Sequence, residues 1–167
     1  YAGITTLDLV PRKVGGRTAP VILIGGKNGV GKTTLLEAVR LALYGRRALG
    51  ARVAQVEYDA HLRNRINRTS GSETAAVALE FDYAEAGTIH RYKIHRKWAA
   101  RGRSVVETLD LLKDGETITS VPREEWHSFL QELIPPGVSQ LFFFDGEKIS
   151  AVDEGADDEA PLGEIGR

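Results

Sequence analysis

The stretch GGKNGVGKTT, residues 25–34, limits the folds open to this chain of 167 residues more than any other part of it. It contains G-x-x-x-x-G-K-[ST], with Gly26, Gly31, Lys32 and Thr33 in the fixed places. Glycines let the backbone curl so that several N–H groups point inward and cradle a phosphate chain. In such a loop the lysine reaches the β- and γ-phosphates, and the threonine hydroxyl binds magnesium. The motif therefore predicts a P-loop that binds ATP and Mg²⁺.

The sequence on either side of the motif supports this interpretation. Before it, residues 19–26 form a β-branched apolar run that ends in glycines, which predicts a buried strand. After it, residues 31–44 place apolar side chains at helical spacing, and Gly45 ends the run. The positive end of that helix would add to the phosphate site. We expect the phosphates to be bound by Gly26, Lys27, Asn28, Gly29, Val30, Gly31, Lys32, Thr33 and Thr34.

The remaining pattern predicts an α/β fold. Alternating and β-branched runs predict an antiparallel meander over about residues 74–120, with Asp114-Gly115 as a hairpin turn. Helices are predicted for a short basic segment within residues 58–72, with Asp59 as a possible N-cap, and for residues 122–134. A short strand is predicted for residues 4–10. Together these elements predict a P-loop NTPase with a mixed sheet, on which the P-loop helix packs, and a meander beside it.

A second stretch, SQLFFFDGEKIS, residues 139–150, has an apolar run that ends in an acidic turn. Hydrolysis needs a carboxylate on magnesium and a group that positions water. Here Asp145 would hold magnesium, directly or through water, and Glu147 would polarise the attacking water. The alternative is a plain core strand with an acidic end. The catalytic candidates are thus Lys32, Asp145 and Glu147, and the candidate metal ligands are Thr33 and Asp145.

Both stretches resemble one branch of the P-loop proteins. Asn28 and Gly29 in the loop, and Leu36 and Glu37 in TTLLEAV followed by LALYG, resemble the SMC-type branch of ABC ATPases. In that branch a Gln-Gly-(Glu or Gln) element, the Q-loop, follows a strand before the coiled coil and reaches the metal. LFFFDGEKI has aspartate in that place and is similar in particular to the DndD-type SMC-like ATPases of bacterial DNA phosphorothioation systems. This resemblance covers roughly residues 1–152 and places Asp145 at the Q-loop position.

The resemblance implies a function and an incomplete site. Residues 1–152 would be the N-terminal lobe of an SMC/ABC-type ATPase head, and residues 153–167 an acidic linker or the start of a coiled-coil region. Walker B and the signature motif would lie in a C-terminal lobe, and a second head would complete the site in a homodimer. The expected function is ATP hydrolysis by a head that acts on DNA in phosphorothioate modification, with other DNA-modification proteins as further partners.

The charge distribution favours contact with DNA. Of 22 Lys and Arg residues, 18 precede Ser104, whereas 15 of 23 Asp and Glu residues follow Arg103. A basic field of this kind is what a phosphate backbone requires. The alternative is an exposed, charged strand that resists aggregation. Tyr92, Ile94 and Trp98 fall in one phase of the strand and are predicted to be core. The candidate contacts are Arg63, Arg65, Arg68, Arg91, Lys93, Arg96, Lys97, Arg101 and Arg103.

Composition excludes some classes and leaves two alternative functions open. Without cysteine there is neither a disulfide framework nor a thiolate metal site. The four histidines lack the spacing of metal ligands and are interpreted as surface or packing residues. No apolar run reaches the ~20 residues that cross a bilayer, so we expect a cytoplasmic protein without a membrane partner. The alternatives are a general SMC-type DNA repair ATPase and a self-contained P-loop kinase or GTPase, although the guanine-reading N-K-x-D is absent from the sequence.

Overall fold

The computed structural model describes residues 3–19, 21–27, 29–67, 71–102 and 104–138. The predicted boundary between residues 152 and 153 lies outside these ranges. In chain order the elements are strands β1 (Lys13–Val14) and β2 (Arg17–Thr18), helix α1 (Lys32–Tyr44), 3₁₀ helix η1 (Gly45–Ala48), helix α2 (Gln55–Asn64), strands β3 (Thr74–Glu85), β4 (Thr88–Arg101), β5 (Ser104–Lys113) and β6 (Glu116–Thr117), 3₁₀ helix η3 (Arg123–Glu125) and helix α3 (Trp126–Leu133).

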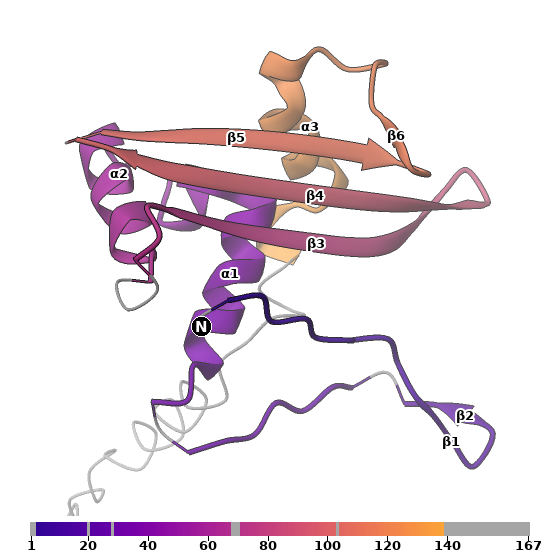
Figure 1. Ribbon diagram of the computed structural model, residues 1–167. Helices are drawn as coiled ribbons and strands as arrows, with labels where there is room; N and C mark the ends of the chain where they lie inside the picture. Colours follow the sequence, from indigo (N-terminus) through magenta and orange to yellow (C-terminus); the bar gives the residue numbers. More distant parts are fainter. Residues whose placement is uncertain (1–2, 20, 28, 68–70, 103, 139–167) are drawn as a thin grey trace, which may run out of the picture.

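Strands β3 to β6 form an antiparallel sheet in the order β3-β4-β5-β6 (Figure 1). Two-residue turns close two of its hairpins: Ala86-Gly87 joins β3 to β4, and Asp114-Gly115 joins β5 to β6. All of these turn residues have positive φ, which suits the right-handed twist of the flanking strands. The meander predicted for about residues 74–120 is confirmed.

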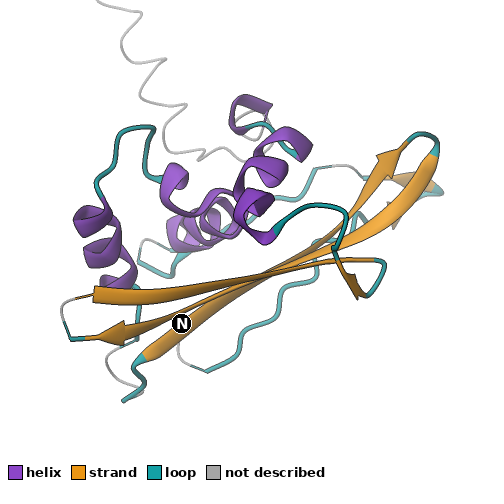
Figure 2. Ribbon diagram, turned by 90° about the horizontal axis from the view of Figure 1, so that it is seen from above, coloured by secondary structure: helices purple, strands orange, loops and turns teal. Residues whose placement is uncertain are grey.

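Helices α1, α2 and α3 pack against one face of this sheet, and the other face is open (Figure 2). Side chains alternate along the central strand β4, so that Tyr92, Ile94 and Trp98 are buried and their neighbours in the other phase point outward. This alternation is the one expected when only one face of an antiparallel sheet is covered. The core prediction for these three residues is confirmed.

Helix α1 follows the P-loop directly and ends where the sequence predicts. Its N-cap, Gly31, has a φ of 98°, and Gly45 at its C-terminus has a φ of 52°. The Gly45 N–H donates to the Leu41 carbonyl and closes the last turn. Val39 and Leu43 are buried in a cluster with Leu111 of β5. The sheet therefore holds the helix that carries the P-loop.

Helix α2 begins earlier in the chain than predicted. The Glu57 carboxylate accepts a hydrogen bond from the Ala54 N–H at 3.2 Å, which satisfies one of the N–H groups that a helix start leaves without an intrahelical acceptor. Asp59, the predicted N-cap, lies inside the helix and accepts a hydrogen bond from Gln55. Helix α3 lies within its predicted range and buries Trp126 and Leu130.

The segment before the P-loop differs from the prediction. Residues 19 and 21–26 form no strand in the structure, and Val21 and Leu23 are 80% and 92% exposed. Residues 4–10 likewise form no strand, and β1 pairs only with β2. An apolar strand of this kind is buried by neighbours on both sides, and Figure 1 shows this stretch as a trace apart from the sheet β3–β6. The buried strand is a wrong prediction for the described residues, and their two sheets are antiparallel rather than mixed.

Candidate nucleotide-binding site

Three glycines give the P-loop its curled backbone. Gly29 and Gly31 have φ values of 84° and 98°, a region that costs any residue with a Cβ atom energy. A Cβ atom built on Gly26 would lie 2.7 Å from Val30 Cγ2, so a larger residue there would have to displace the Val30 side chain. Asn28 lies outside the described residues. The loop thus has the local geometry that lets backbone N–H groups face a bound phosphate.

The Lys32 side chain folds back over this loop. Its Nζ donates to the Gly26 carbonyl at 2.9 Å and to the Lys27 carbonyl at 3.4 Å. An ammonium group held at the mouth of the loop lies where a P-loop lysine meets phosphate oxygens. The position of Lys32 fits a polyphosphate ligand.

The first turn of α1 carries no negative charge. It contains no acidic residue, and no described side chain caps its N-terminus. The N-terminus of a helix has partial positive charge and N–H groups without intrahelical acceptors, which together favour an anion. Thr33 and Thr34 are exposed on this turn. The structure therefore brings the predicted phosphate-binding residues of the described chain together at one helix end.

The predicted metal-binding half of the site is not tested by the structure. Asp145 and Glu147 lie outside the described residues, whereas Thr33 lies within them on the first turn of α1. Lys32 and Thr33 fit the binding of ATP with its magnesium ion. When bound, that ion would neutralise phosphate charge, and the threonine hydroxyl is the described group that would contact it.

Arginines after the P-loop helix lie far from the loop. Arg46 and Arg47 belong to η1, which follows the 13 residues of α1. A helix of this length spans ~20 Å at a rise of 1.5 Å per residue. Arg46 Nη1 instead donates to Gln55 Oε1 at 3.3 Å. These two arginines are therefore at the opposite end of α1 from Lys32.

The basic residues predicted to contact DNA have different surroundings. The prediction that Arg96 contacts DNA is wrong, because its side chain is 0% exposed. Arg65 forms an ion pair with Glu37, and Arg63 Nη2 donates to the Ser104 carbonyl. Arg68 and Arg103 lie outside the described residues. The remaining members of the set, Arg91, Lys93, Lys97 and Arg101, are exposed on β4.

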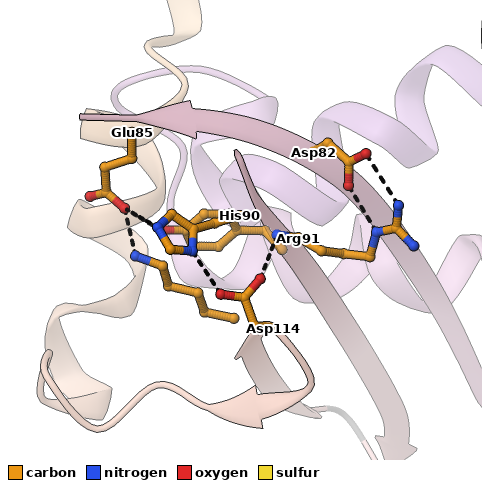
Figure 3. Close-up of polar contacts among 7 residues, drawn as sticks. Asp82, Glu85, His90, Arg91 and Asp114 are labelled. Atoms are coloured by element: carbon orange, nitrogen blue, oxygen red, sulfur yellow. Dashed lines mark hydrogen bonds and ion pairs between the residues drawn. The ribbon is translucent and has the colours of Figure 1, made fainter. Parts of the chain in front are cut away.

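Acidic and basic groups pair near the β3–β4 turn, on the open face at Arg91 and Asp82 and at the edge of the covered face at His90 (Figure 3). Arg91 Nε donates to Asp82 Oδ1 at 2.8 Å, and the Arg91 N–H donates to Asp114 Oδ1 at 2.9 Å. His90 Nδ1 lies 2.7 Å from Asp114 Oδ2. The hydrogen bond from Arg91 lowers the pKa of Asp82, and the bonds from Arg91 and His90 lower the pKa of Asp114. Acidic and basic side chains therefore offset each other at this end.

The other half of the same face carries basic side chains among small, uncharged ones. Lys97 on β4 pairs in register with Ala76 of β3 and Thr108 of β5, and Arg101 pairs with Ser104. Both basic side chains are exposed. Across the described strands, the residues opposite them carry no acidic group. Positive charge remains uncompensated by register partners in this half.

A partly buried polar cluster that the sequence did not predict lies between the sheet and the helices. Arg96 Nη1 donates to Glu107 Oε1 at 2.6 Å, and Tyr58 of α2 donates to the same oxygen at 2.8 Å. His127 Nε2 of α3 lies 3.2 Å from Arg96 Nη1. Burial, followed by the charge of Glu107, raises the pKa of Tyr58, so its hydroxyl stays a donor. Strand phase was the available signal, because Arg96 shares the phase of Ile94 and Trp98.

We expect His127 to make the stability of the fold depend on pH. His127 keeps an exposed side, but its ring faces the core at Arg96. Partial burial of the ring, followed by the charge of Arg96, lowers its pKa below the usual 6.5, because an imidazolium would face a guanidinium. Unfolded chains then bind the proton more readily than folded ones, so the unfolding free energy should decrease as the pH falls below 6.5. Urea unfolding at a series of pH values measures this loss.

A His127→Gln variant should remove the part of the pH dependence that comes from His127, since the amide oxygen accepts the Arg96 hydrogen bond without titrating. In a His61→Gln variant that part should remain, although burial also lowers the pKa of His61. An unchanged slope in His127→Gln would contradict the assignment.

The described part of the chain holds no group of three or more His, Asp or Glu side chains placed to bind a metal ion. None of its helices combines the length and the apolar character that a membrane crossing demands.

The comparisons with known proteins agree with the P-loop. The chain is similar to a DNA double-strand break repair Rad50 ATPase of Halobacterium salinarum, with 37% identity over 82 residues. That alignment covers 49% of this chain and 8% of the relative, so the chain spans only a small part of the relative's length. No solved structure matches the chain. A family model described as an AAA domain matches residues 3–159, and the chain therefore belongs to the AAA domain family.

Proposed function

We propose that this chain is part of an ATP-binding and ATP-hydrolysing head of the SMC/Rad50 type. The observation that carries the proposal is the P-loop, in which Lys32 Nζ contacts the Gly26 carbonyl at 2.9 Å at the start of α1. The AAA domain match and the similarity to a Rad50 ATPase support it. In this function Lys32 and the loop amides bind the phosphates, and Thr33 binds magnesium.

The catalytic half of the site is proposed on the sequence alone. Asp145 would meet the magnesium ion and Glu147 would polarise water, with further groups supplied by a C-terminal lobe and by a second head. The exposed apolar side chains of residues 4–10 and 21–24 support the need for additional strands, because a large exposed apolar surface marks an interface.

The nucleotide function is tested by binding and turnover together. A fluorescent ATP analogue should bind with Mg²⁺, and unlabelled ATP should displace it. The ATPase rate should rise more steeply than linearly with protein concentration, because two heads must meet to complete one site. An ATPase rate that is simply proportional to protein concentration would favour the self-contained kinase or GTPase. A lack of ATP binding would refute the proposal.

We propose DNA as a partner of the uncompensated half of the open sheet face. Replacing Lys97 or Arg101 with alanine should weaken binding of duplex DNA. For each residue removed, the plot of the logarithm of the association constant against the logarithm of the salt concentration should become less steep by about 1, because each phosphate contact releases about one counterion from the DNA. Fluorescence anisotropy over a series of salt concentrations measures this slope.

Arg91→Ala is the matched control, since Asp82 already neutralises that side chain on the same strand. Equal slopes for Lys97→Ala and the unchanged protein would exclude this surface. A larger effect of Arg91→Ala would place the contact at the opposite end of the sheet.

Phosphorothioate modification stays a narrower proposal. It depends on LFFFDGEKI, which lies outside the described residues, and neither the family description nor the name of the relative refers to it. The name of the relative favours the alternative hypothesis, a general SMC-type DNA repair ATPase.

A further inference from the structure

The end of α1 remote from the P-loop is held by a residue of the sheet. The guanidinium of Arg96 donates twice to the Ala42 carbonyl, from Nε at 3.3 Å and from Nη2 at 3.2 Å. Ala42 lies in the last turn of α1, where carbonyls have no intrahelical partner and carry partial negative charge. A buried guanidinium therefore caps the helix whose opposite end carries Lys32.

The same guanidinium joins α1 to two other parts of the core. Its Nη1 contacts Glu107 of β5 and His127 of α3, at 2.6 and 3.2 Å. A Cβ atom on Gly45 would lie 2.8 Å from Arg96 Nη1, so glycine at the helix end leaves room for this contact. Since buried charges are costly unless they are paired, the fully buried Arg96 depends on these partners, and its bonds to the Ala42 carbonyl restrain the end of α1.

We propose that Arg96 is a positioning residue for the nucleotide site, and this inference rests on the proposed ATP function. Helix α1 is a rod of ~20 Å, so a tilt of about 5° at its Arg96 end would displace the P-loop end by nearly 2 Å. Displacements of about 1 Å can cost a reacting site ~10²-fold in rate. Through His127 the same residue contacts α3, which precedes Asp145 in the chain.

Trp98 supplies a matched control on the same strand. Its Nε1 donates to the Leu62 carbonyl at 2.9 Å, near the end of α2. Arg96 and Trp98 thus make equivalent contacts, each from the inner face of β4 to the last turn of a helix. Of these two hydrogen bonds, only that of Arg96 is made to the helix that carries the P-loop. Trp98 also packs in one apolar cluster with Leu41 of α1, and phenylalanine keeps an apolar ring at that position.

The test compares Arg96→Met with Trp98→Phe, and includes Arg96→Lys in case the first variant does not fold. Lysine keeps the charge beside Glu107 but lacks the planar fork that reaches the Ala42 carbonyl at the same time. Affinity for the fluorescent ATP analogue is measured under conditions in which each variant is folded by circular dichroism. Amide hydrogen exchange of α1 and α2 is measured without nucleotide.

The Arg96 variants should weaken nucleotide binding by about tenfold, which is ~1.4 kcal/mol, and should speed exchange in α1 rather than α2. Trp98→Phe should speed exchange in α2 and leave nucleotide affinity within about twofold. Equal affinity losses in both variants would show a general structural role and overturn the proposal, as would unchanged α1 exchange in the Arg96 variants. If the unchanged protein binds no ATP, the proposed function fails, and the exchange pattern alone decides whether Arg96 positions α1.

Discussion

Replacing Lys32 with alanine should weaken ATP binding by about 10²-fold, the largest effect on affinity expected for one side chain of this chain. An ammonium that makes charge-assisted hydrogen bonds to phosphate contributes roughly 3 kcal/mol in a partly enclosed site. In the structure this group already lies over the loop, 2.9 Å from the Gly26 carbonyl. Equilibrium titration with the fluorescent ATP analogue and Mg²⁺ measures the loss.

Lys93→Ala provides the control for lost charge, because it removes an exposed lysine on the open face of the sheet. Its nucleotide affinity should match that of the unchanged protein. Undiminished binding by the Lys32→Ala variant would remove the basis of the ATP proposal.

Replacing Glu107 with leucine should cost about 3–5 kcal/mol of unfolding free energy, because it leaves the buried Arg96 without its carboxylate. The pair is joined at 2.6 Å, and the arginine side chain is 0% exposed. Tyr58 would lose its acceptor in the same step. Urea unfolding followed by tryptophan fluorescence gives the free energy directly.

The double variant Arg96→Met/Glu107→Leu should recover much of this loss, because it leaves no buried charge unpaired. Asp82→Asn, which removes an exposed partner of Arg91, should change the free energy by less than about 1 kcal/mol. If Glu107→Leu changed the unfolding free energy as little as Asp82→Asn, the pair of Arg96 and Glu107 would not contribute measurably to stability.

Elements defined by local signals were predicted well from the sequence. Helix α1 has apolar residues at helical spacing and ends at Gly45, whose positive φ suits glycine. The turn at Asp114-Gly115 has the backbone that its residues favour. Both features depend on neighbours in the chain, so the sequence carries the information directly.

Features that depend on distant partners were predicted less well. Residues 19–26 have the composition of a buried strand, but a strand forms only where a neighbouring strand provides backbone hydrogen bonds. Arg96 was counted with the exposed basic residues because of its charge, although its phase along β4 matches Ile94 and Trp98. Glu107 shares the inner phase of β5 with Leu109 and Leu111. Two opposite charges in the inner phases of adjacent strands are the sequence signal for such a buried pair.

The order of elements along the chain has a consequence for synthesis on the ribosome. Helix α1 emerges before strands β4 and β5, against which Val39 and Leu43 are buried. The last of these strands follows α1 by roughly 70 residues, which takes on the order of 4–14 s at typical translation rates. During that interval the apolar side of the P-loop helix has no sheet to cover it, and it is a natural substrate for chaperones that bind nascent chains.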